Sequence, residues 1–125
     1  MCSTLICLLF VGCDEHRTIV SDLVTVIDGD TIEFESVRYR LTGFDTPETY
    51  NAKCDIEYDR GKQAEDKLRQ LIESVGRVQL NIQPSTDKYG RGLAKLFVSG
   101  EDVGSILIRA GLARTYRSGS RSTWC

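Results

Sequence analysis

The sequence has few of the features that define several common classes of protein. It contains one histidine, His16, and its five cysteines form no CxxC pair, so a structural zinc site has little support. The apolar run at residues 5–11 is much shorter than the ~20 residues that a membrane-spanning helix needs. The formal net charge of −2 argues against a protein that coats nucleic acid by bulk attraction. No internal repeat or low-complexity segment stands out.

The composition indicates one ordinary globular domain. At 125 residues, 41% hydrophobic and 27% charged, the chain is long enough for a single hydrophobic core. Its charge is uneven, because Arg109, Arg114, Arg117 and Arg121 lie in a C-terminal stretch that has no acidic residue. Such a local patch can grip a few phosphates even when the net charge is negative.

Residues 1–13 are predicted to be a signal peptide. The apolar run ends at Gly12 and Cys13, and the charged run 14–17 follows at once. This order resembles a bacterial lipoprotein signal, in which the cysteine after a small residue becomes the lipidated N-terminus. The alternatives are an ordinary secretory signal and a buried N-terminal strand. We therefore expect an exported protein, attached to the membrane of the cell envelope through a lipidated Cys13 or else secreted or periplasmic.

Hydrophobic periodicity predicts a mainly β protein with helices. Residues 14–21 are expected to form a linker and residues 49–58 a surface loop, and Pro84 is expected to end a strand. The order of three strands, a helix, two strands and a helix fits the α+β class, as an OB-type five-stranded barrel flanked by two helices. The strands are expected at 23–27, 31–34, 37–42, 78–82 and 93–98, and the helices at 60–75 and 102–110.

Two carboxylates stand out in the acidic stretch at residues 26–48. Asp30 and Asp45 follow strand ends, and hairpin pairing can bring them to one edge of the sheet. Carboxylates that meet in this way are costly unless a cation lies between them. Oxygen ligands without cysteine or histidine select a hard ion, calcium or magnesium. The alternative is that both residues only cap their own turns.

Three further side chains suggest phosphate chemistry beside these acids. Glu48 can activate a water as a general base, which contributes ~10²–10⁴-fold of the ~10⁶–10¹⁷-fold that enzymes supply. The rest must come from electrostatic stabilisation, a role that suits the forked guanidinium groups of Arg40 and Arg91. Alternatively, Arg40 forms a surface salt bridge with Glu33 or Glu35, and Arg91 is a solvated loop residue.

A glycine-flanked loop and a tyrosine near the C-terminus complete the candidate site. Lys88 can meet a second phosphate, and Tyr89 and Tyr116 can lie against a base or sugar. Taken one at a time, each of these three residues is explained about equally well by ordinary side-chain packing and by contact with a substrate.

Taken together, these motifs resemble the staphylococcal nuclease (thermonuclease) family. The sequence VIDGDT is followed by R-L-x-x-x-D-T-P-E, then by DKYGRG, and then by an apolar helix that runs into GLA. The similarity runs from about residue 23 to residue 116. It implies an OB barrel with helices and calcium-dependent cleavage of DNA and RNA, carried out by a domain at residues 14–125 that ends in a short arginine-rich tail.

The resemblance also implies roles for individual residues, with Ca²⁺ favoured over Mg²⁺ and DNA and/or RNA as the substrate. Asp30 and Asp45 correspond to the calcium-binding carboxylates, and Thr46 to the residue that offers a backbone carbonyl to the ion. Glu48 corresponds to the general base. The remaining assignments are Arg40 and Arg91 to phosphate binding, Lys88 and Tyr89 to the terminal phosphate of a nucleotide, and Tyr116 approximately to base stacking.

The cysteines predict a covalent link. After export and signal removal, Cys54 and Cys125 are the two that remain apart from a lipidated Cys13. In an oxidising compartment we expect them to pair, which would tie the C-terminal tail to the loop that follows the site. The alternative is two free thiols.

Three functions are compatible with these features. The first is an exported, monomeric, metal-dependent endonuclease of low sequence specificity. The second is a non-catalytic OB-type module that binds nucleic acid or a protein. The third is a lipid-anchored structural protein of the envelope, which would leave DGDT, DTPE and DKYGRG unexplained. The full set of acidic and arginine positions favours the enzyme.

Overall fold

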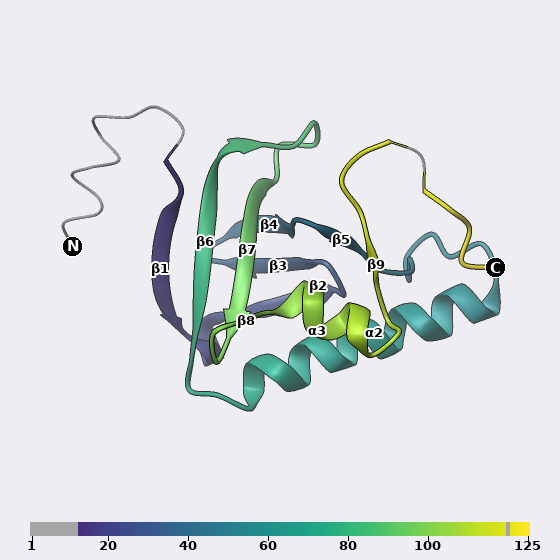
Figure 1. Cartoon of the computed structure of the whole chain (residues 1–125), viewed down its shortest axis with the longest axis horizontal. Coiled ribbons are helices and arrows are strands. Elements are labelled where there is room, and N and C mark those ends of the chain that lie inside the picture. Colours follow the sequence, from purple (N-terminus) through teal and green to yellow (C-terminus); the bar gives the residue numbers. More distant parts are fainter. Residues whose placement is uncertain (1–12, 120) are drawn as a thin grey trace.

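The computed structural model describes residues 13–119 and 121–125, and these form an α+β fold (Figure 1). A mixed sheet is packed against two helices, α2 and α3. The elements in chain order are β1 (Glu15–Val20), a 3-10 turn (Ser21–Leu23), β2 (Thr25–Asp28), β3 (Thr31–Phe34), β4 (Val37–Leu41), β5 (Phe44–Asp45), α2 (Asp55–Glu73), β6 (Arg77–Thr86), β7 (Gly92–Val98), β8 (Glu101–Asp102), α3 (Val103–Arg109) and β9 (Arg114–Thr115).

The main sheet has seven strands in the order β1-β6-β7-β4-β3-β2, with the short β8 paired to β7. β4 and β7 are parallel and the other neighbours are antiparallel. β5 and β9 form a separate two-stranded ladder. The α+β, OB-type class predicted from the sequence is confirmed. Among the described residues, however, β1 and β2 lie at the two ends of the strand order, so the hydrogen-bonded barrel is not closed.

The register of these strands assembles one edge of the sheet. Thr31 of β3 pairs with Arg40 of β4, so the turn that carries Asp30 lies beside Arg40. Arg40 in turn pairs with Leu93 of β7, which places the loop at 87–91 next to the same edge. Residues that are distant in sequence therefore meet where β3, β4 and β7 run side by side.

The turn between β2 and β3 requires glycine because other parts of the chain press against it. A Cβ added at Gly29 would lie 2.8 Å from Thr46 Oγ1 and 2.9 Å from the Cβ of Ala64 on α2. Real Cβ atoms do not approach other heavy atoms so closely. The absence of a side chain thus lets the acidic turn, the segment after β5 and α2 pack together.

The core lies between the sheet and the helices. Leu68 of α2 and Leu107 of α3 have no exposed surface, and Phe44 of β5 is 1% exposed. Burying such a side chain contributes about 1.5–3 kcal/mol. The sides of α2 and α3 that carry these residues therefore face the core, and α3 packs against β5.

The N-terminal part of the folded domain differs from the expected linker. Residues Glu15–Val20 form β1, which pairs with β6 from Glu15 opposite Ile82 to Val20 opposite Arg77. The prediction was wrong because β1 contributes one fully buried residue, Ile19, so no alternating pattern marks it in the sequence.

Two element boundaries also differ. The expected loop at 49–58 gives way to α2 at Asp55, five positions before the expected start at residue 60. In its first turn the apolar residues Ile56 and Tyr58 are exposed and the buried residue is Glu57, so hydrophobic periodicity does not show it. Pro84 does not end β6, which continues to Thr86. Its missing N–H is tolerated because Pro84 lies in the register shift between Ile82 and Thr86.

The predicted signal peptide lies outside the described residues, except for Cys13. That residue has a free thiol and is half-buried just before β1. None of the helices in the described part of the chain is long and apolar enough to cross a membrane.

Candidate active site

Arg40 lies between the two carboxylates that the sequence singles out. Its Nη2 atom is 3.3 Å from Asp30 Oδ2 and 3.4 Å from Asp45 Oδ1. All three side chains are nearly buried, with 6–11% of each exposed. Asp30 and Asp45 therefore share one edge, as the hairpin arrangement predicts, and in the structure a guanidinium rather than open space separates them.

Backbone contacts fix Arg40 in this position. It donates hydrogen bonds to the carbonyl of Leu41 and, at 3.1 Å, to the carbonyl of Phe44. Glu33 and Glu35, the surface partners considered from the sequence, pair with other arginines. Arg40 is thus buried beside the two acids and does not form the surface ion pair considered from the sequence.

Three acids at this edge have raised pKa values, mainly because they are buried. Burial raises the pKa of Asp28 to about 7, with a further rise from its contact with Asp30. Burial also raises the pKa values of Asp45 and Glu48, and the charge on Asp30 adds to both although Arg121 opposes the rise. A cation bound here would relieve this repulsion.

The donor chemistry fits a hard divalent ion. The acids offer carboxylate oxygens, and Thr46 lies beside them, 3% exposed, with its N–H donating to Asp30 Oδ2 at 3.3 Å. No group of three or more histidine, cysteine or acidic residues in the described part of the chain is arranged as a complete metal site. Two guanidinium groups, those of Arg40 and Arg121, each lie 3.4 Å from Asp45 Oδ1.

The backbone of Glu48 is held in place by a second glutamate, Glu57, which the sequence did not single out. The Glu57 carboxylate is buried, with 5% of the residue exposed, and accepts from the N–H of Lys53 at 2.7 Å and from the N–H of Glu48 at 3.4 Å. Glu57 therefore closes the loop that presents Glu48. The signal in the sequence is a pair of acids in the first turn of α2, Asp55 and Glu57, where acids favour a helix start.

Arg91 reaches the same edge from the loop before β7. Its Nε donates to Asp87 Oδ2 at 2.7 Å, and its Nη1 donates to the Thr31 hydroxyl at 3.3 Å. Asp87 also accepts the backbone N–H groups of Tyr89 and Arg91, each at 2.9 Å. Asp87 thus shapes the loop and holds the guanidinium of Arg91 towards β3.

A cavity between β4, this loop and the segment after β9 brings the remaining predicted residues together. Lys88, Tyr89 and Tyr116 line it, although Lys88 and Tyr89 are also largely exposed. Tyr116 is fixed by its N–H, which donates to the Gly43 carbonyl at 3.1 Å. The charged lining is predominantly basic, with Arg40, Lys88, Arg91, Arg117 and Arg121 against one acid, Asp87.

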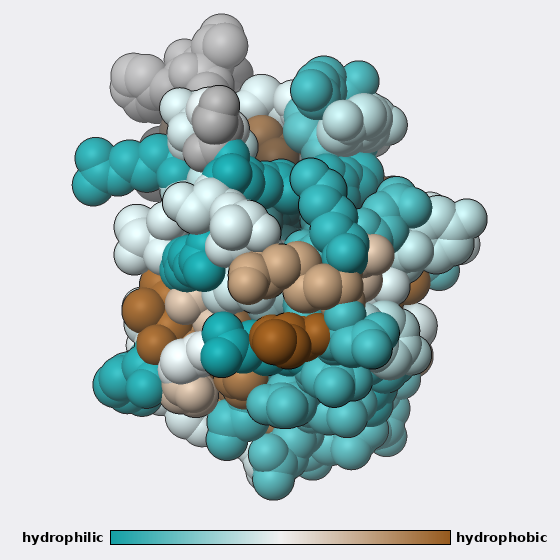
Figure 2. Space-filling view, turned by 90° about the vertical axis from the view of Figure 1, so that its right-hand side faces the viewer, coloured by the Kyte–Doolittle hydropathy of each residue, from teal (hydrophilic) through white to brown (hydrophobic). Residues whose placement is uncertain are grey.

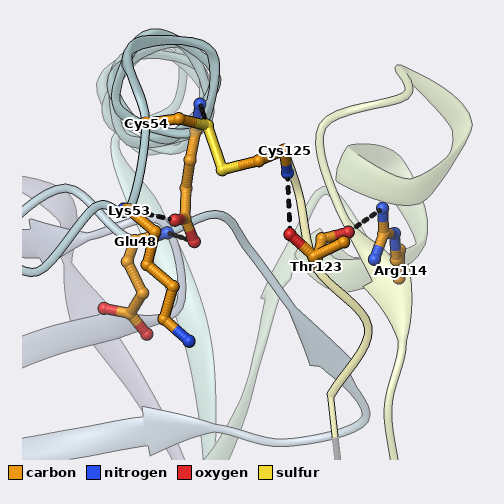
Figure 3. Close-up of a disulfide and its surroundings, with 7 residues drawn as sticks. Glu48, Lys53, Cys54, Arg114, Thr123 and Cys125 are labelled. Carbon is orange, nitrogen blue, oxygen red and sulfur yellow. Dashed lines mark hydrogen bonds between the residues drawn. A yellow bond between two sulfur atoms is a disulfide. The ribbon is translucent and has the colours of Figure 1, made fainter.

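The C-terminal segment returns to the loop that carries Glu48. Cys54 and Cys125 are joined by a disulfide, with their Cα atoms 6.2 Å apart, and Figure 3 shows this link beside Glu48. Arg114 stacks on the Trp124 ring, 3.7 Å from its centroid, and donates to the backbone carbonyls of residues 122 and 123. The face that carries this segment is mostly hydrophilic, with small separated hydrophobic areas (Figure 2).

Comparison with known proteins shows which family this chain belongs to. The family model "Staphylococcal nuclease homologue" matches residues 38–123. That stretch covers more than half of the chain, and the protein belongs to this family. It contains most of β4, both helices and most of the site residues.

Curated relatives include two kinds of bacterial nuclease. Endonuclease YncB of Bacillus subtilis (strain 168) is 38% identical over 109 residues, which cover 81% of this chain and 50% of the relative. Thermonuclease of Staphylococcus intermedius is 37% identical over 94 residues, which cover 71% of this chain and 55% of the relative. The chain thus spans about half the length of these relatives.

Proposed function

We propose that this protein is a metal-dependent nuclease that hydrolyses phosphodiester bonds of DNA and/or RNA with low sequence specificity. The observation that carries the proposal is the junction of two chemically different features at one edge. An acidic cluster with Asp30, Asp45 and Glu48 adjoins a basic cavity lined by Arg40 and Arg91. Family membership supports the same activity, as do the relatives, which are an endonuclease and a thermonuclease.

In this proposal, a phosphate of the substrate binds in the basic cavity. Arg40 and Arg91 both line it, and their planar guanidinium groups can each hold two phosphate oxygens. Lys88 and Tyr89 extend the contact along the chain of nucleotides, with Tyr116 on the opposite wall as a stacking surface. Low sequence specificity follows because these groups contact phosphates and ring faces rather than base edges.

Glu48 is the proposed general base. A water oxygen attacks phosphorus while one of its protons passes to the Glu48 carboxylate, and the phosphorus–oxygen ester bond on the opposite side breaks. The leaving oxygen takes a proton from solvent water, and Glu48 then returns its proton to solvent. The burial that raises the pKa of Glu48 makes its carboxylate a better proton acceptor. Glu57 keeps this carboxylate at the rim by holding the backbone of the loop.

We propose Ca²⁺ as the cofactor, with Mg²⁺ as the less favoured ion. Asp30, Asp45 and the backbone carbonyl of Thr46 would hold it. A bound divalent cation would polarise a phosphate oxygen and neutralise developing negative charge. Flexible oxygen ligands that include a carbonyl suit calcium better than the stricter octahedral shell of magnesium.

The test is cleavage of single-stranded DNA, duplex DNA and RNA by the full chain in calcium, magnesium or a chelator. Glu48→Gln is compared with Glu73→Gln, the same change on an exposed acid at the far end of α2. We expect cleavage that needs calcium and falls by ~10²–10⁴-fold in Glu48→Gln alone. Arg40→Lys should also impair turnover, because an ammonium cannot replace a bidentate fork. Folded protein that binds DNA but cuts nothing under any ion would instead make it the non-catalytic module.

We also propose that the protein is exported, with Cys13 as the lipid attachment point or with the signal removed altogether, and that it acts as a monomer. The support is the sequence order at residues 5–17 and the position of Cys13 just before β1. Intact mass of the protein purified from cells should show diacylglycerol on Cys13, and Cys13→Ser should release it from membranes. An unprocessed N-terminus in cytosol would refute export.

A further inference from the structure

We propose that Arg121, carried by a disulfide-tethered C-terminal segment, is a substrate-binding arginine that serves as an exchangeable counterion of the acidic cluster. In the free protein its guanidinium neutralises Asp45 and Glu48. When a divalent cation and a nucleic-acid phosphate bind, it leaves the carboxylates and pairs with the phosphate. This inference rests on the proposed nuclease function and adds a residue that the sequence analysis counted only as part of an arginine-rich tail.

The position of Arg121 is the first support. Its Nη1 atom is 3.4 Å from Asp45 Oδ1 and 3.3 Å from Glu48 Oε1, so it bridges a proposed metal ligand and the proposed base. With 42% of its side chain exposed, it is far more accessible than Arg40 at 9%. Arg40 is nearly buried and also donates to backbone carbonyls, whereas Arg121 is partly exposed and can change partners more readily.

Arg121 also lies where the acidic cluster meets the basic cavity. It lines the cavity with Arg91 and Lys88, and it lines the adjacent hollow with Glu48 and Thr46. Its guanidinium stacks over the Tyr116 ring, 5.1 Å from the centroid. A short side-chain rotation about this platform would therefore carry the positive charge from the carboxylates into the cavity.

The segment that carries Arg121 is anchored on both sides. After it, Cys125 is bonded to Cys54 at the start of α2, and Arg114 stacks on Trp124. Before it, the Tyr116 hydroxyl donates to the Gly119 carbonyl at 3.0 Å, and β9 pairs with β5. Figure 1 shows the segment leaving β9 and ending at the N-terminal end of α2. These anchors limit the positions that Arg121 can reach, which lowers the entropic cost of binding a phosphate.

Exchange of counterions predicts two effects of opposite sign for Arg121→Ala. Removing a positive charge next to Asp45 should strengthen Ca²⁺ binding by a few fold, as the strength of a partly exposed ion pair suggests. Removing a phosphate partner should weaken the binding of DNA. It should also make the plot of log affinity against log salt less steep, by about 0.7 for single strands. A purely structural role would weaken both interactions together.

The experiment measures the two affinities separately on the full chain. Calorimetry gives Ca²⁺ binding for the wild type, Arg121→Ala and Arg121→Lys without DNA. Fluorescence anisotropy gives binding of a labelled single-stranded oligonucleotide in calcium at several salt concentrations. The second series is made in a Glu48→Gln background to keep the DNA intact. Arg109→Ala is the matched control, because Arg109 is 63% exposed, pairs with Glu101 and lies on α3 away from the cavity.

We expect Arg121→Ala to bind Ca²⁺ more tightly and DNA more weakly, Arg121→Lys to keep the salt slope, and Arg109→Ala to match the wild type. A Cys54→Ser/Cys125→Ser double variant should shrink the effect of Arg121→Ala on DNA affinity, because the arginine is then no longer held in place. Unchanged DNA affinity and slope in Arg121→Ala, or weaker binding of both ligands, would overturn the proposal. Because these are binding measurements, they remain decisive even if the wild type proves to cut nothing.

Discussion

Glu57 offers the sharpest test of how the fold positions the proposed base. Its carboxylate is buried and accepts two backbone N–H groups, from Lys53 at 2.7 Å and from Glu48 at 3.4 Å. In Glu57→Gln, the amide has one oxygen acceptor, so one of these N–H groups faces an NH₂ donor instead. A hydrogen bond to a charged group is worth about 1.5–3 kcal/mol, and we expect a loss of stability in that range.

Turnover should fall by more than the fraction of protein that the loss of stability unfolds. A displacement of about 1 Å in a reacting group can cost ~10²-fold in rate, and the N–H of Glu48 is the weaker of the two contacts. We therefore expect Glu57→Gln to lower turnover by ~10–100-fold while most of the protein stays folded. Glu57→Ala, which removes both acceptors, should be worse in stability and turnover.

Urea unfolding of the oxidised protein gives the stability change, from a shift in midpoint at unchanged slope. Initial rates of DNA cleavage at saturating calcium give the turnover. Glu73→Gln is the control, since it makes the same chemical change on the same helix at an exposed position. Glu57→Gln with wild-type turnover, or with a loss of stability no greater than that of Glu73→Gln, would refute the positioning role.

Three further outcomes follow from the packing and the charges. The bridge between Cys54 and Cys125 spans 71 positions, so replacing both with serine should cost about 4 kcal/mol in urea unfolding, and the untreated protein should have no reactive thiol at either position. Gly61→Ala should destabilise the protein, because its Cβ would lie 2.7 Å from a backbone carbonyl in the loop after β5, whereas Gly76→Ala, with open space around it, should not. Burial acts to raise the pKa of Glu65, but hydrogen bonds from a lysine and an arginine on the same helix outweigh it and lower that pKa. Glu65 should therefore stabilise the fold above the ordinary pKa of glutamate and lose this contribution as the pH falls through its lowered value, a dependence that Glu65→Gln should flatten in unfolding curves followed by circular dichroism.

Much of the fold is readable in the sequence because it depends on local patterns. The strand before the Asp-Gly-Asp turn is rich in β-branched residues, the strand at 37–42 alternates in hydrophobicity, and both helices carry an apolar stripe with residues buried in the core. Asp102 caps α3 by accepting the N–H of Gly104 at 2.8 Å, as its position before the stripe predicts. Each of these segments buries one face against the core. The order of apolar and polar residues within the segment is therefore sufficient to predict it.

What the sequence alone determined is thus the order of the elements, the α+β class and the set of candidate residues that tertiary structure would bring together. Only the tertiary structure decided how those residues are arranged. It put Arg40 between Asp30 and Asp45, placed Glu57 beneath the Glu48 loop, and brought Arg121 back to the acidic edge. The physical reason is that each of these contacts joins a charged side chain to a group from a separate part of the chain. The partners therefore depend on strand register and on where the chain returns, and not on any local periodicity. The same reason explains why β1 escaped notice, since its place in the sheet is defined by pairing with β6, a strand more than fifty residues away.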